Sequence, residues 1–562
     1  MPKYFIKGKG EITLSKSDFR AAGGFGSVYV KGSTAYKIYH DPANMIPVAK
    51  ISELSNLTEP YIVRPRAIIL DSKNKPVGYT MLNINNGYAL CQMFPKAFRL
   101  RKNLDVNNTA NLVQKLREGV GFVHSKDSLI VDLNEMNFMI TDKFDQVYFL
   151  DVDSYQTKSF KATSLMDSIR DRHCHNKQFN TGTDWFAFGI VSFQMFVGIH
   201  PFKGTYIPLS NIDKDKRLDA RMLQNISVLH KDVTIPSVTL DFSNIPNSYR
   251  QWYEAVFERG ERVAPPKDMQ AVVVIAKVQR LSGSNNFEIN DFFTGDGDII
   301  SINHDIIVTS KFIYRGHSIL APSQPDVKIG FTPKMGYAVS AHCEDGEVKL
   351  FNLDTKKPID SYIACQDLMS YEGSLYCRFE NAVYQVDFIE THSQVMATGK
   401  IVGNVMEKSS QVFDGVIMQN MLGSYFAMIF PEPGGNYEFK INELDGYQVI
   451  DAKFSKGVLM VVGNKGGKYD KFVIRFSKDY YTKDIRVSND IVYSGLNFVV
   501  LDNGVCINLN EKDEVMVFRS EKDATLTKVI TDPSIKSDSK LFSVGVSTII
   551  AHGNNAHKIK MK

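Results

Sequence analysis

In the 562-residue sequence the spacing of apolar residues changes near Ser282 to Asn286, from helix-like to strand-like. This change constrains the fold more than any other feature. Before this small polar stretch, runs with helical spacing alternate with short β-like runs. After it, β-rich runs alternate with turns built from Gly, Asn or Asp, and no long helical spacing recurs. The chain is also long for a single core. We therefore expect an α+β domain over residues 10–275, a linker over 276–295 and an all-β domain over 296–562.

The first part contains three segments with helical character. Apolar residues recur on one face over 105–125, where Leu112, Leu116 and Val120 share that face. The segment 183–197 is apolar nearly all round, which predicts a buried helix. At roughly 15 residues its apolar run is short for a membrane span. A third helix is expected between Pro246 and Gly260.

The second part repeats a hairpin-like unit. Six stretches, such as "YAVSAHCEDGEVKLFNL" and "VLMVVGNKGGKYDKFVIRF", place a Gly, Asn or Asp turn between two β-rich runs. Their average spacing of about 40 residues is the length of a four-stranded propeller blade. This pattern predicts a β-propeller. A pair of β-sandwiches is the alternative, because no unit carries a Trp-Asp signature.

Composition and charge narrow the function classes. A net charge of only +4 does not indicate a general nucleic-acid-binding surface. The N-terminus lacks the apolar core of a signal peptide, so we expect a soluble, cytoplasmic protein that is not bound to a membrane. Six cysteines without a pairing rhythm favour free thiols in a reducing compartment. They are Cys91, Cys174, Cys343, Cys365, Cys377 and Cys506.

A glycine-rich stretch, "AAGGFGSVYV", lies near the N-terminus. Ala21, Gly23 and Gly26 occupy the spacing of a Gly-x-Gly-x-x-Gly-x-Val loop that Val28 closes. Glycines let main-chain N–H groups approach phosphate oxygens. Lys37 follows in the apolar run "TAYKIY". Taken alone, such a loop is a common hairpin, and such a lysine is usually an outward-facing charge.

Acidic and amide residues at regular intervals follow. In "LIVDLNEMNFMI", Asp132 and Asn137 stand five apart between apolar residues, as in a loop held by two buried anchors. Asp151 follows the apolar strand "VYFL", and Asp184 opens the buried helix. The order of glycine loop, strand lysine, Asp-x4-Asn and two later aspartates is that of a protein kinase.

Residues 10 to 270 therefore resemble the protein-kinase superfamily, and in particular bacterial and phage-type Ser/Thr kinase-like proteins. The resemblance implies a two-lobed fold that binds ATP and Mg²⁺. Lys37 would contact the phosphates, and Asp132 would accept or orient the substrate hydroxyl. Asn137 and Asp151 would hold Mg²⁺.

Other roles follow from the same resemblance. Asp184 would brace the catalytic loop, and Arg262 looks like the late structural arginine. Nucleotide contacts are expected from Gly23, Gly24, Gly26, Val28, Lys37, Glu53, Leu82 and Ile84. Glu53 is the expected helix glutamate, with Glu59 as its rival, and the main chain near Leu82 to Ile84 would meet the adenine.

The sequence also departs from the kinase pattern. Ile130-Val131 stands where many kinases have His-Arg, and Asn134 replaces the loop lysine. Asp153 replaces the glycine of the metal motif, and no Ala-Pro-Glu stretch precedes Asp184. Losing the loop lysine should weaken transition-state stabilisation unless another cation substitutes.

We expect an active Mg-ATP-dependent Ser/Thr kinase whose propeller docks a protein substrate or partner. The alternatives are a pseudokinase scaffold and a small-molecule or lipid kinase. "RHCHNK" places His173, Cys174 and His175 together, but adjacent ligands rarely close one metal site. The sequence also predicts that the two halves fold separately, with the boundary near residues 282 to 286.

Overall fold

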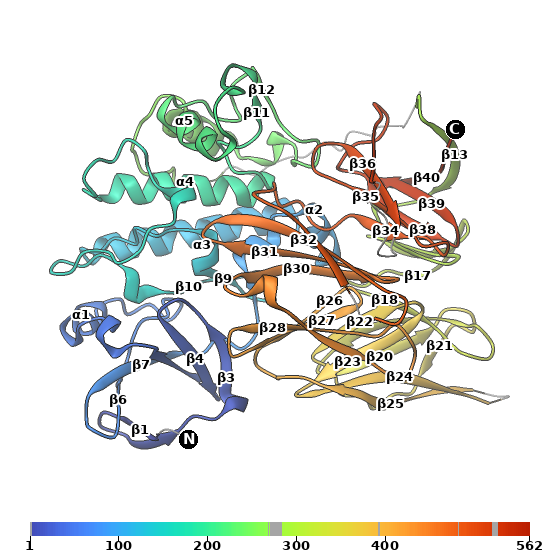
Figure 1. Ribbon diagram of the computed structural model, residues 1–562, viewed down its shortest axis with the longest axis horizontal. Coiled ribbons are helices and arrows are strands. Elements are labelled where there is room, and N and C mark those ends of the chain that lie inside the picture. The colour runs from blue at the N-terminus through green and yellow to red at the C-terminus, as the bar shows by residue number, and fades with distance from the viewer. Residues whose placement is uncertain (1–2, 268, 270–283, 392–393, 481–482, 520–526) are drawn as a thin grey trace.

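The computed structural model describes residues 3–267, 269, 284–391, 394–480, 483–519 and 527–562. These residues form a mixed α/β part and an all-β part that lie against each other (Figure 1). The mixed part runs through residue 269. The all-β part begins at residue 284.

The mixed part opens with a seven-stranded antiparallel sheet. Its order is β2-β1-β6-β7-β5-β4-β3. In β5, next to the central strand β7, buried and half-buried residues do not alternate strictly, because both faces of the strand are covered. The strands are β1 (Lys3–Ile6), β2 (Gly10–Thr13), β3 (Phe19–Ala22), β4 (Gly26–Lys31), β5 (Thr34–Tyr39), β6 (Ile68–Leu70) and β7 (Pro76–Leu82).

Within the described ranges, six α-helices follow or interrupt this sheet. The three expected helices are confirmed as α3, α4 and α6. The α4 helix begins at an Asn180 cap and ends where Gly198 takes a left-handed φ of 77°. The helices are α1 (Val48–Leu54), α2 (Lys96–Arg101), α3 (Val106–Ser125), α4 (Thr181–Val197), α5 (Arg217–Leu223) and α6 (Asn247–Phe257).

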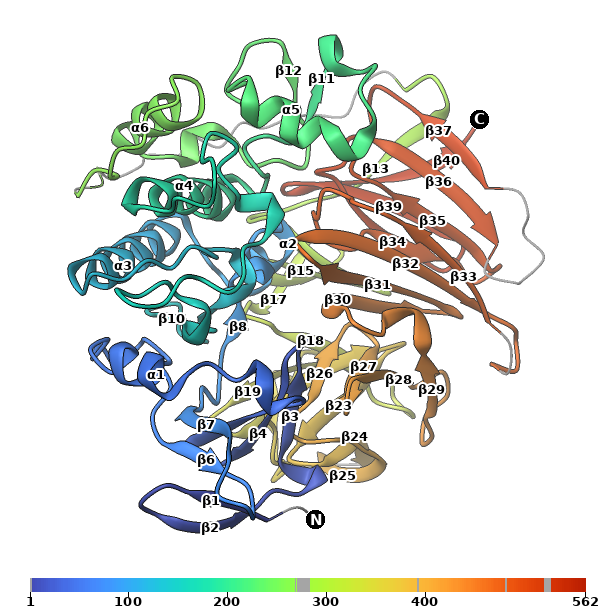
Figure 2. The same cartoon turned by 60° about the vertical axis from the view of Figure 1, so that its left-hand side comes forward.

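Two small sheets complete the mixed part. A three-stranded sheet, ordered β10-β9-β8, lies between the large sheet and the helices and carries the loops of the candidate site. A two-stranded sheet lies near α5 (Figure 2). Their strands are β8 (Tyr88–Ala89), β9 (Phe138–Ile140), β10 (Val147–Phe149), β11 (Thr205–Tyr206) and β12 (Val233–Thr234).

The all-β part consists of four-stranded antiparallel sheets, of which the described residues form seven. The first three are β14 (Ile299–Asn303), β15 (Ile306–Thr309), β16 (Phe312–Arg315) and β17 (Ser318–Pro322); β18 (Lys328–Phe331), β19 (Ala338–Glu344), β20 (Glu347–Asn352) and β21 (Lys357–Ile359); and β22 (Asp367–Tyr371), β23 (Ser374–Phe379), β24 (Ala382–Glu390) and β25 (Val395–Asn404).

The next three sheets are also built from four consecutive strands, whereas the seventh sheet is not. They are β26 (Ser410–Phe413), β27 (Val416–Met421), β28 (Ser424–Ile429) and β29 (Tyr437–Ile441); β30 (Gln448–Ser455), β31 (Val458–Lys465), β32 (Lys468–Phe476) and β33 (Lys483–Ser488); and β34 (Phe498–Val500), β35 (Val505–Leu509), β36 (Glu514–Arg519) and β37 (Lys528–Thr531). The seventh joins β38 (Lys540–Val544), β39 (Ser547–His552) and β40 (Asn555–Met561) to β13 (Phe287–Thr294) from the start of the part.

Each of these sheets packs on the next through its own apolar cluster. Val458 and Met460 of β31, for example, pack on Phe498 of β34. The last sheet packs back on the first, because Ile549 of β39 shares a cluster with Ile307 of β15. The seven sheets therefore succeed one another without an unpaired first or last sheet.

The two parts share one hydrophobic core, contrary to the expectation of separable halves. Ile450, Val462 and Tyr469 of the all-β part are buried in the cluster that also holds α3 and α4. Polar contacts add to it: Lys203 Nζ lies 2.9 Å from Asp490 Oδ1. Removing either part would expose apolar surface of the other.

The structure changes two further expectations. The linker expected over 276–295 runs into β13, so the all-β part starts before residue 296, while residues 276–283 lie outside the described ranges. Cys343 and Cys365 form a disulfide, so the expectation of six free thiols is wrong for this pair, and the inference of a reducing compartment loses that support. Sheet packing brings the two residues together with Cα atoms 6.2 Å apart, which sequence spacing does not reveal.

None of the helices in the described ranges is long and apolar enough to cross a membrane.

The shared core predicts coupled unfolding. Val462→Ala removes buried volume in the all-β part and should cost about 2 kcal/mol. Both tryptophans of the chain, Trp185 and Trp252, lie in the mixed part, so their fluorescence reports on that part alone. We expect the thermal midpoint from tryptophan fluorescence to fall together with the midpoint from circular dichroism. A fluorescence midpoint equal to that of the wild type would show that the parts unfold independently.

Candidate functional site

Lys37 connects the large sheet to the segment after β10. It lies on β5, and its Nζ is 2.7 Å from Asp153 Oδ2 and 3.3 Å from Asp151 Oδ1. The Tyr39 hydroxyl donates to the same Asp153 oxygen at 2.7 Å. Asp151 immediately precedes η5 (Val152–Ser154), a single 3-10 turn, and Asp153 lies within it. The turn therefore presents two acidic side chains to one lysine.

Burial and charge act in opposite directions on these groups. Burial disfavours the charged form of Lys37, but Asp153 and Asp151 outweigh it and raise the lysine pKa. Burial also opposes ionisation of Asp153, yet Lys37 holds the pKa of that carboxyl below its ordinary value. Burial raises the pKa of Asp151 to about 6 despite the nearby lysine. Asp153 is therefore the principal counter-ion of Lys37.

A second lysine lies close to these carboxylates. Lys50 on α1 is 1% exposed, and its Nζ has no hydrogen-bond partner among the residues the structure describes. Burial lowers its pKa, while Asp153 and Asp151 act to raise it. An unpaired buried ammonium is costly, so this position is not explained by stability alone. Sequence reasoning missed Lys50, because a lysine in a short helix looks like a surface residue.

The loop that carries Asp132 is fixed from below by Asp184. The buried Asp184 carboxylate accepts from the main-chain N–H groups of Ile130 and Val131 at 2.8 and 2.9 Å, and His124 Nε2 lies 2.9 Å away. Val131 takes a φ of 63°, a left-handed conformation that a β-branched residue rarely adopts. Strain of this kind persists where surrounding contacts over-determine the backbone, typically at functional sites.

The Asp132 carboxylate is buried and fully engaged. Its Oδ1 accepts from Asn134 Nδ2 at 2.9 Å and from the Met166 main-chain N–H at 2.6 Å. Its Oδ2 accepts from the Ser164 hydroxyl at 3.0 Å. Asn134, at the position of the loop lysine in the kinase pattern, thus orients Asp132 rather than supplying a charge.

Asn137 and Asp151 come together because β9 pairs with β10. Phe138 opposes Phe149, and Leu150 N donates to Asn137 O at 2.8 Å, so the two residues lie at the same end of the pair. Asn137 Nδ2 donates to Asp132 O at 2.9 Å, and no described residue donates to its Oδ1. One carboxylate and one amide oxygen fit Mg²⁺, which takes few protein ligands and completes its shell with water and phosphate.

No cluster of three or more His, Cys, Asp or Glu side chains in the described ranges is arranged to hold a metal ion. The pair Asn137 and Asp151 does not conflict with this finding, because only Asp151 is a residue of these four types.

The glycine stretch forms the turn between β3 and β4. Gly23 N donates to Gly26 O at 2.9 Å. Gly26 must be glycine, because a Cβ there would lie 2.5 Å from Ile38 O, whereas Gly23 and Gly24 face open space. Val28 pairs directly with Lys37 across β4 and β5, so the turn leads into the strand beside the lysine.

The other three expected contact residues lie on α1 and at or just after the end of β7, the strand that pairs with β5. Leu82 ends β7, and Ile84 follows two residues later. The Glu53 carboxylate accepts from the main chain of Ser159 at 3.2 Å, and the ion pairs of Lys37 go to Asp151 and Asp153 instead. The helix that should carry an acidic partner for Lys37 thus presents Lys50, and the aspartates after β10 take that acidic role.

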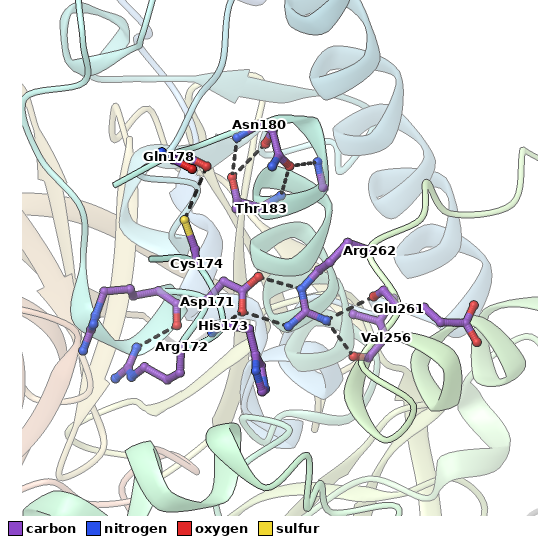
Figure 3. A network of polar contacts seen from close by, with 12 residues as sticks. Asp171, Arg172, His173, Cys174, Gln178, Asn180, Thr183, Val256, Glu261 and Arg262 are labelled. Atoms are coloured by element: carbon purple, nitrogen blue, oxygen red, sulfur yellow. Dashed lines mark hydrogen bonds and ion pairs between the residues drawn. The ribbon is translucent and has the colours of Figure 1, made fainter. Parts of the chain in front are cut away.

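Arg262 has a partner that sequence reasoning did not find. Its Nε and Nη2 donate to the two oxygens of Asp171 at 2.6 and 2.8 Å, and the guanidinium lies 4.4 Å from the Phe186 ring centre (Figure 3). Asp171 precedes the His173-Cys174 stretch and fixes the segment before α4. The sequence carries no local signal for this pair, because the two residues are 91 positions apart.

Comparison with known proteins adds little. No protein-family model matches the chain, and no curated protein matches it. Among solved structures, one described as "ROP18 kinase domain in complex with AMP-PNP and sucrose" is similar at 13% identity with a TM-score of 0.28, covering 40% of this chain and 77% of that chain. At this TM-score the likeness carries no weight for fold or function.

The Arg262–Asp171 pair predicts a pH-dependent stability. Arg262→Ala leaves a buried carboxylate without its counter-ion and should cost about 3 kcal/mol. Although burial opposes it, Arg262 lowers the pKa of Asp171, so the pair stabilises the fold above the unfolded pKa of about 4 and this stability is lost as pH falls. We expect the variant to lose less stability than the wild type between pH 6 and roughly pH 3 in urea unfolding.

Arg259→Ala is the matched control, because Arg259 pairs with Glu261 on the exposed surface. It should change stability by less than about 1 kcal/mol. Equal effects of the two substitutions would mean that the Asp171 pair has no special role.

Proposed function

We propose that this protein is a Mg-ATP-dependent protein kinase that transfers the γ-phosphate to Ser or Thr hydroxyls of proteins. In this proposal the mixed part has the two-lobed kinase fold, and the all-β part is a seven-bladed β-propeller closed by β13 and β40. The ring-like succession of seven four-stranded sheets supports the propeller. The rest of the proposal depends on the chemistry of the site.

One observation carries the activity. The Asp132 carboxylate accepts a serine hydroxyl, from Ser164, at 3.0 Å. A general base must lie at 2.6–3.2 Å from the proton that it removes. The site therefore already holds an alcohol of the substrate class in hydrogen-bond reach of the proposed base.

Each residue then has a role in the transfer. Asp132 would accept the proton of the substrate hydroxyl while that oxygen bonds to the γ-phosphorus and the bond from this phosphorus to the ADP oxygen breaks, so that ADP leaves. Lys37 places a positive charge where phosphate oxygens would lie, and Asn137 and Asp151 supply oxygen ligands for Mg²⁺. ATP, when bound, would supply the phosphoryl group, and Mg²⁺ would neutralise charge on its phosphate oxygens. Asp184 holds the loop so that Asp132 and Asn137 keep their relative positions.

A pseudokinase scaffold is the second candidate, and the same contacts favour it. All of the Asp132 contacts come from the chain itself, and Lys37 is engaged by two carboxylates. For catalysis Ser164 must leave Asp132, and Lys37 must turn toward phosphate. A scaffold would keep both contacts permanently.

We also propose that the all-β part docks the protein substrate. Exposed apolar side chains lie on or beside the sheet β22 to β25, where Tyr362 is 94% and Ile401 is 59% exposed.

The base is tested with Asp132→Asn, which keeps the size of the side chain and removes its negative charge. The wild type is incubated with Mg-ATP and a protein lysate, and phosphosites are counted by mass spectrometry. We expect transfer by the wild type and a loss of roughly 100-fold in the variant. Asp127→Asn, at an exposed left-handed position just before the loop, should transfer as the wild type does.

The outcomes separate the two candidates. Equal transfer by wild type and Asp132→Asn would overturn the assignment of the base. No transfer by any variant, together with intact nucleotide binding, would identify the scaffold. Phosphate found only on a small metabolite would indicate a small-molecule kinase.

The Mg²⁺ ligands are tested separately. Asp151→Ala removes one of two oxygen ligands, so Mg-dependent nucleotide binding in calorimetry should fall below detection. Stability should change little, since Lys37 keeps its shorter pair with Asp153. Asp142→Ala, on the exposed turn between β9 and β10, is the control and should bind nucleotide normally. Nucleotide binding by Asp151→Ala that still responds to Mg²⁺ would contradict the assignment.

A further inference from the structure

A cavity of about 590 Å³ lies at the junction of the two parts, away from the candidate site. One wall comes from α5 and the residues around β11 in the mixed part. The other comes from β32, β33 and β36 in the all-β part. Its volume is in the range of small-molecule sites, which often lie between structural units.

The cavity is strongly basic. Eight lysine and arginine residues line it, against three aspartate and glutamate residues. The chain as a whole carries a charge of only +4, so this imbalance is local. A concave surface of one sign concentrates ligands of the opposite charge.

Some of these cations hold the two parts together. Lys203 pairs with Asp490, and Lys214 Nζ donates to Asn489 O at 2.9 Å. Arg217 donates to main-chain oxygens of its own part. These contacts explain some of the basic residues in the lining. A ligand is indicated only if other lysines or arginines of the lining lack a partner in the protein.

Lys471 is the first cation that the fold leaves without a partner. It lies on β32, is 9% exposed, and its ammonium makes no hydrogen bond or ion pair with any residue in the described ranges. Burial lowers its pKa, and Glu511 across the cavity opposes this only through space. Most of the side chain is buried while the ammonium borders the open cavity, and a charge that has lost much of its hydration without gaining a partner is costly. Its retention is explained if a bound anion supplies the partner.

Arg221 is the second, and it comes from the opposite wall. It lies on α5 and is 3% exposed. Its Nε donates to Ile226 O at 2.7 Å and its Nη1 to Gly204 O at 3.3 Å, which fixes the guanidinium. Its Nη2 has no partner among the described residues. Two buried cations from different parts of the chain thus border one cavity.

Apolar side chains complete the lining. Tyr206 and Leu218 contribute from the mixed part, and Val473, Met516 and Phe518 from the all-β part. Such a surface can pack against the apolar body of a ligand. A free inorganic anion would leave these apolar side chains in contact with water.

We propose that this cavity binds a small molecule that carries a phosphate, carboxylate or sulfonate group on an apolar or aromatic body. The anionic group pairs with Lys471, with Arg221 contributing from the opposite wall. The body packs between Leu218 and Phe518. Because both walls contribute, the bound ligand stabilises the junction of the two parts. This site is independent of phosphoryl transfer.

The test uses the full chain and the fluorescent probe anilinonaphthalene sulfonate, an aromatic body with one sulfonate. We expect saturable binding to the wild type and a Kd about tenfold higher for Lys471→Met, because a charge-assisted hydrogen bond is lost. Lys440→Met removes an exposed lysine of β29 outside the cavity and should bind like the wild type. Met516→Trp fills the apolar wall and should also weaken binding.

Stability separates a ligand-binding role from a structural one. Lys471→Met removes an unpaired buried charge, so its thermal midpoint without probe should equal or exceed that of the wild type. A lower midpoint would make Lys471 a structural residue and overturn the proposal. Probe binding unchanged in both Lys471→Met and Met516→Trp would overturn it as well.

Displacement identifies the chemical class. Phenyl phosphate presents a phosphate on an aromatic ring, and decanoate presents a carboxylate on an acyl chain. Displacement of the probe by the first assigns an aromatic phosphate, and displacement by the second assigns an acyl carboxylate. A probe that neither compound displaces, or one that binds Lys471→Met equally well, would show that the cavity does not select anions.

Discussion

The ion pair between Lys37 and Asp153 is the contact on which the candidate site depends. It joins the N-terminal sheet to a turn 116 residues later and fixes Asp151 on that turn. Buried ion pairs add little net stability, because both charges lose their hydration. Removing one partner, however, leaves an uncompensated charge. The pair therefore specifies position more than it stabilises: it places Lys37, Asp151 and Lys50 in one small volume.

The all-β part holds the other side of the site. The Tyr469 hydroxyl donates at 2.8 Å to Glu135, a fully buried carboxylate of the loop that carries Asp132 and Asn137. A buried carboxylate without such a donor would cost 1–3 kcal/mol or more. The loop is thus braced by Asp184 from the mixed part and by Tyr469 from the all-β part. Tyr469 therefore links this loop to the interface between the two parts.

The sequence predicts local structure well and long-range pairing poorly. The hairpins and the helices α3, α4 and α6 were predictable because periodicity and turn residues are local signals. The kinase resemblance predicted that Lys37, Asp132, Asn137, Asp151 and Asp184 lie near one another. The structure pairs Lys37 with Asp151 and joins the loop of Asp132 and Asn137 to Asp184. Four features had no local signal: the shared core, the Asp171 partner of Arg262, the buried Lys50 and the Cys343–Cys365 disulfide. Each depends on residues far apart in the chain, and a single sequence does not show which distant residues are in contact.

The contact between Ser164 and Asp132 links these features. Ser164 and Met166 lie on a segment whose next residues touch the all-β part, where a Cβ on Gly467 would lie 2.7 Å from Met166 Sδ and from Ser168 Oγ. Gly467 also has a φ of 78°, so both its conformation and the close approach require glycine. The all-β part thereby limits how far the segment of Ser164 and Met166 can move away from Asp132. Rotation of the Ser164 side chain suffices to release the carboxylate, whereas a shift of the whole segment meets the β31–β32 turn, so the all-β part constrains the position of this segment.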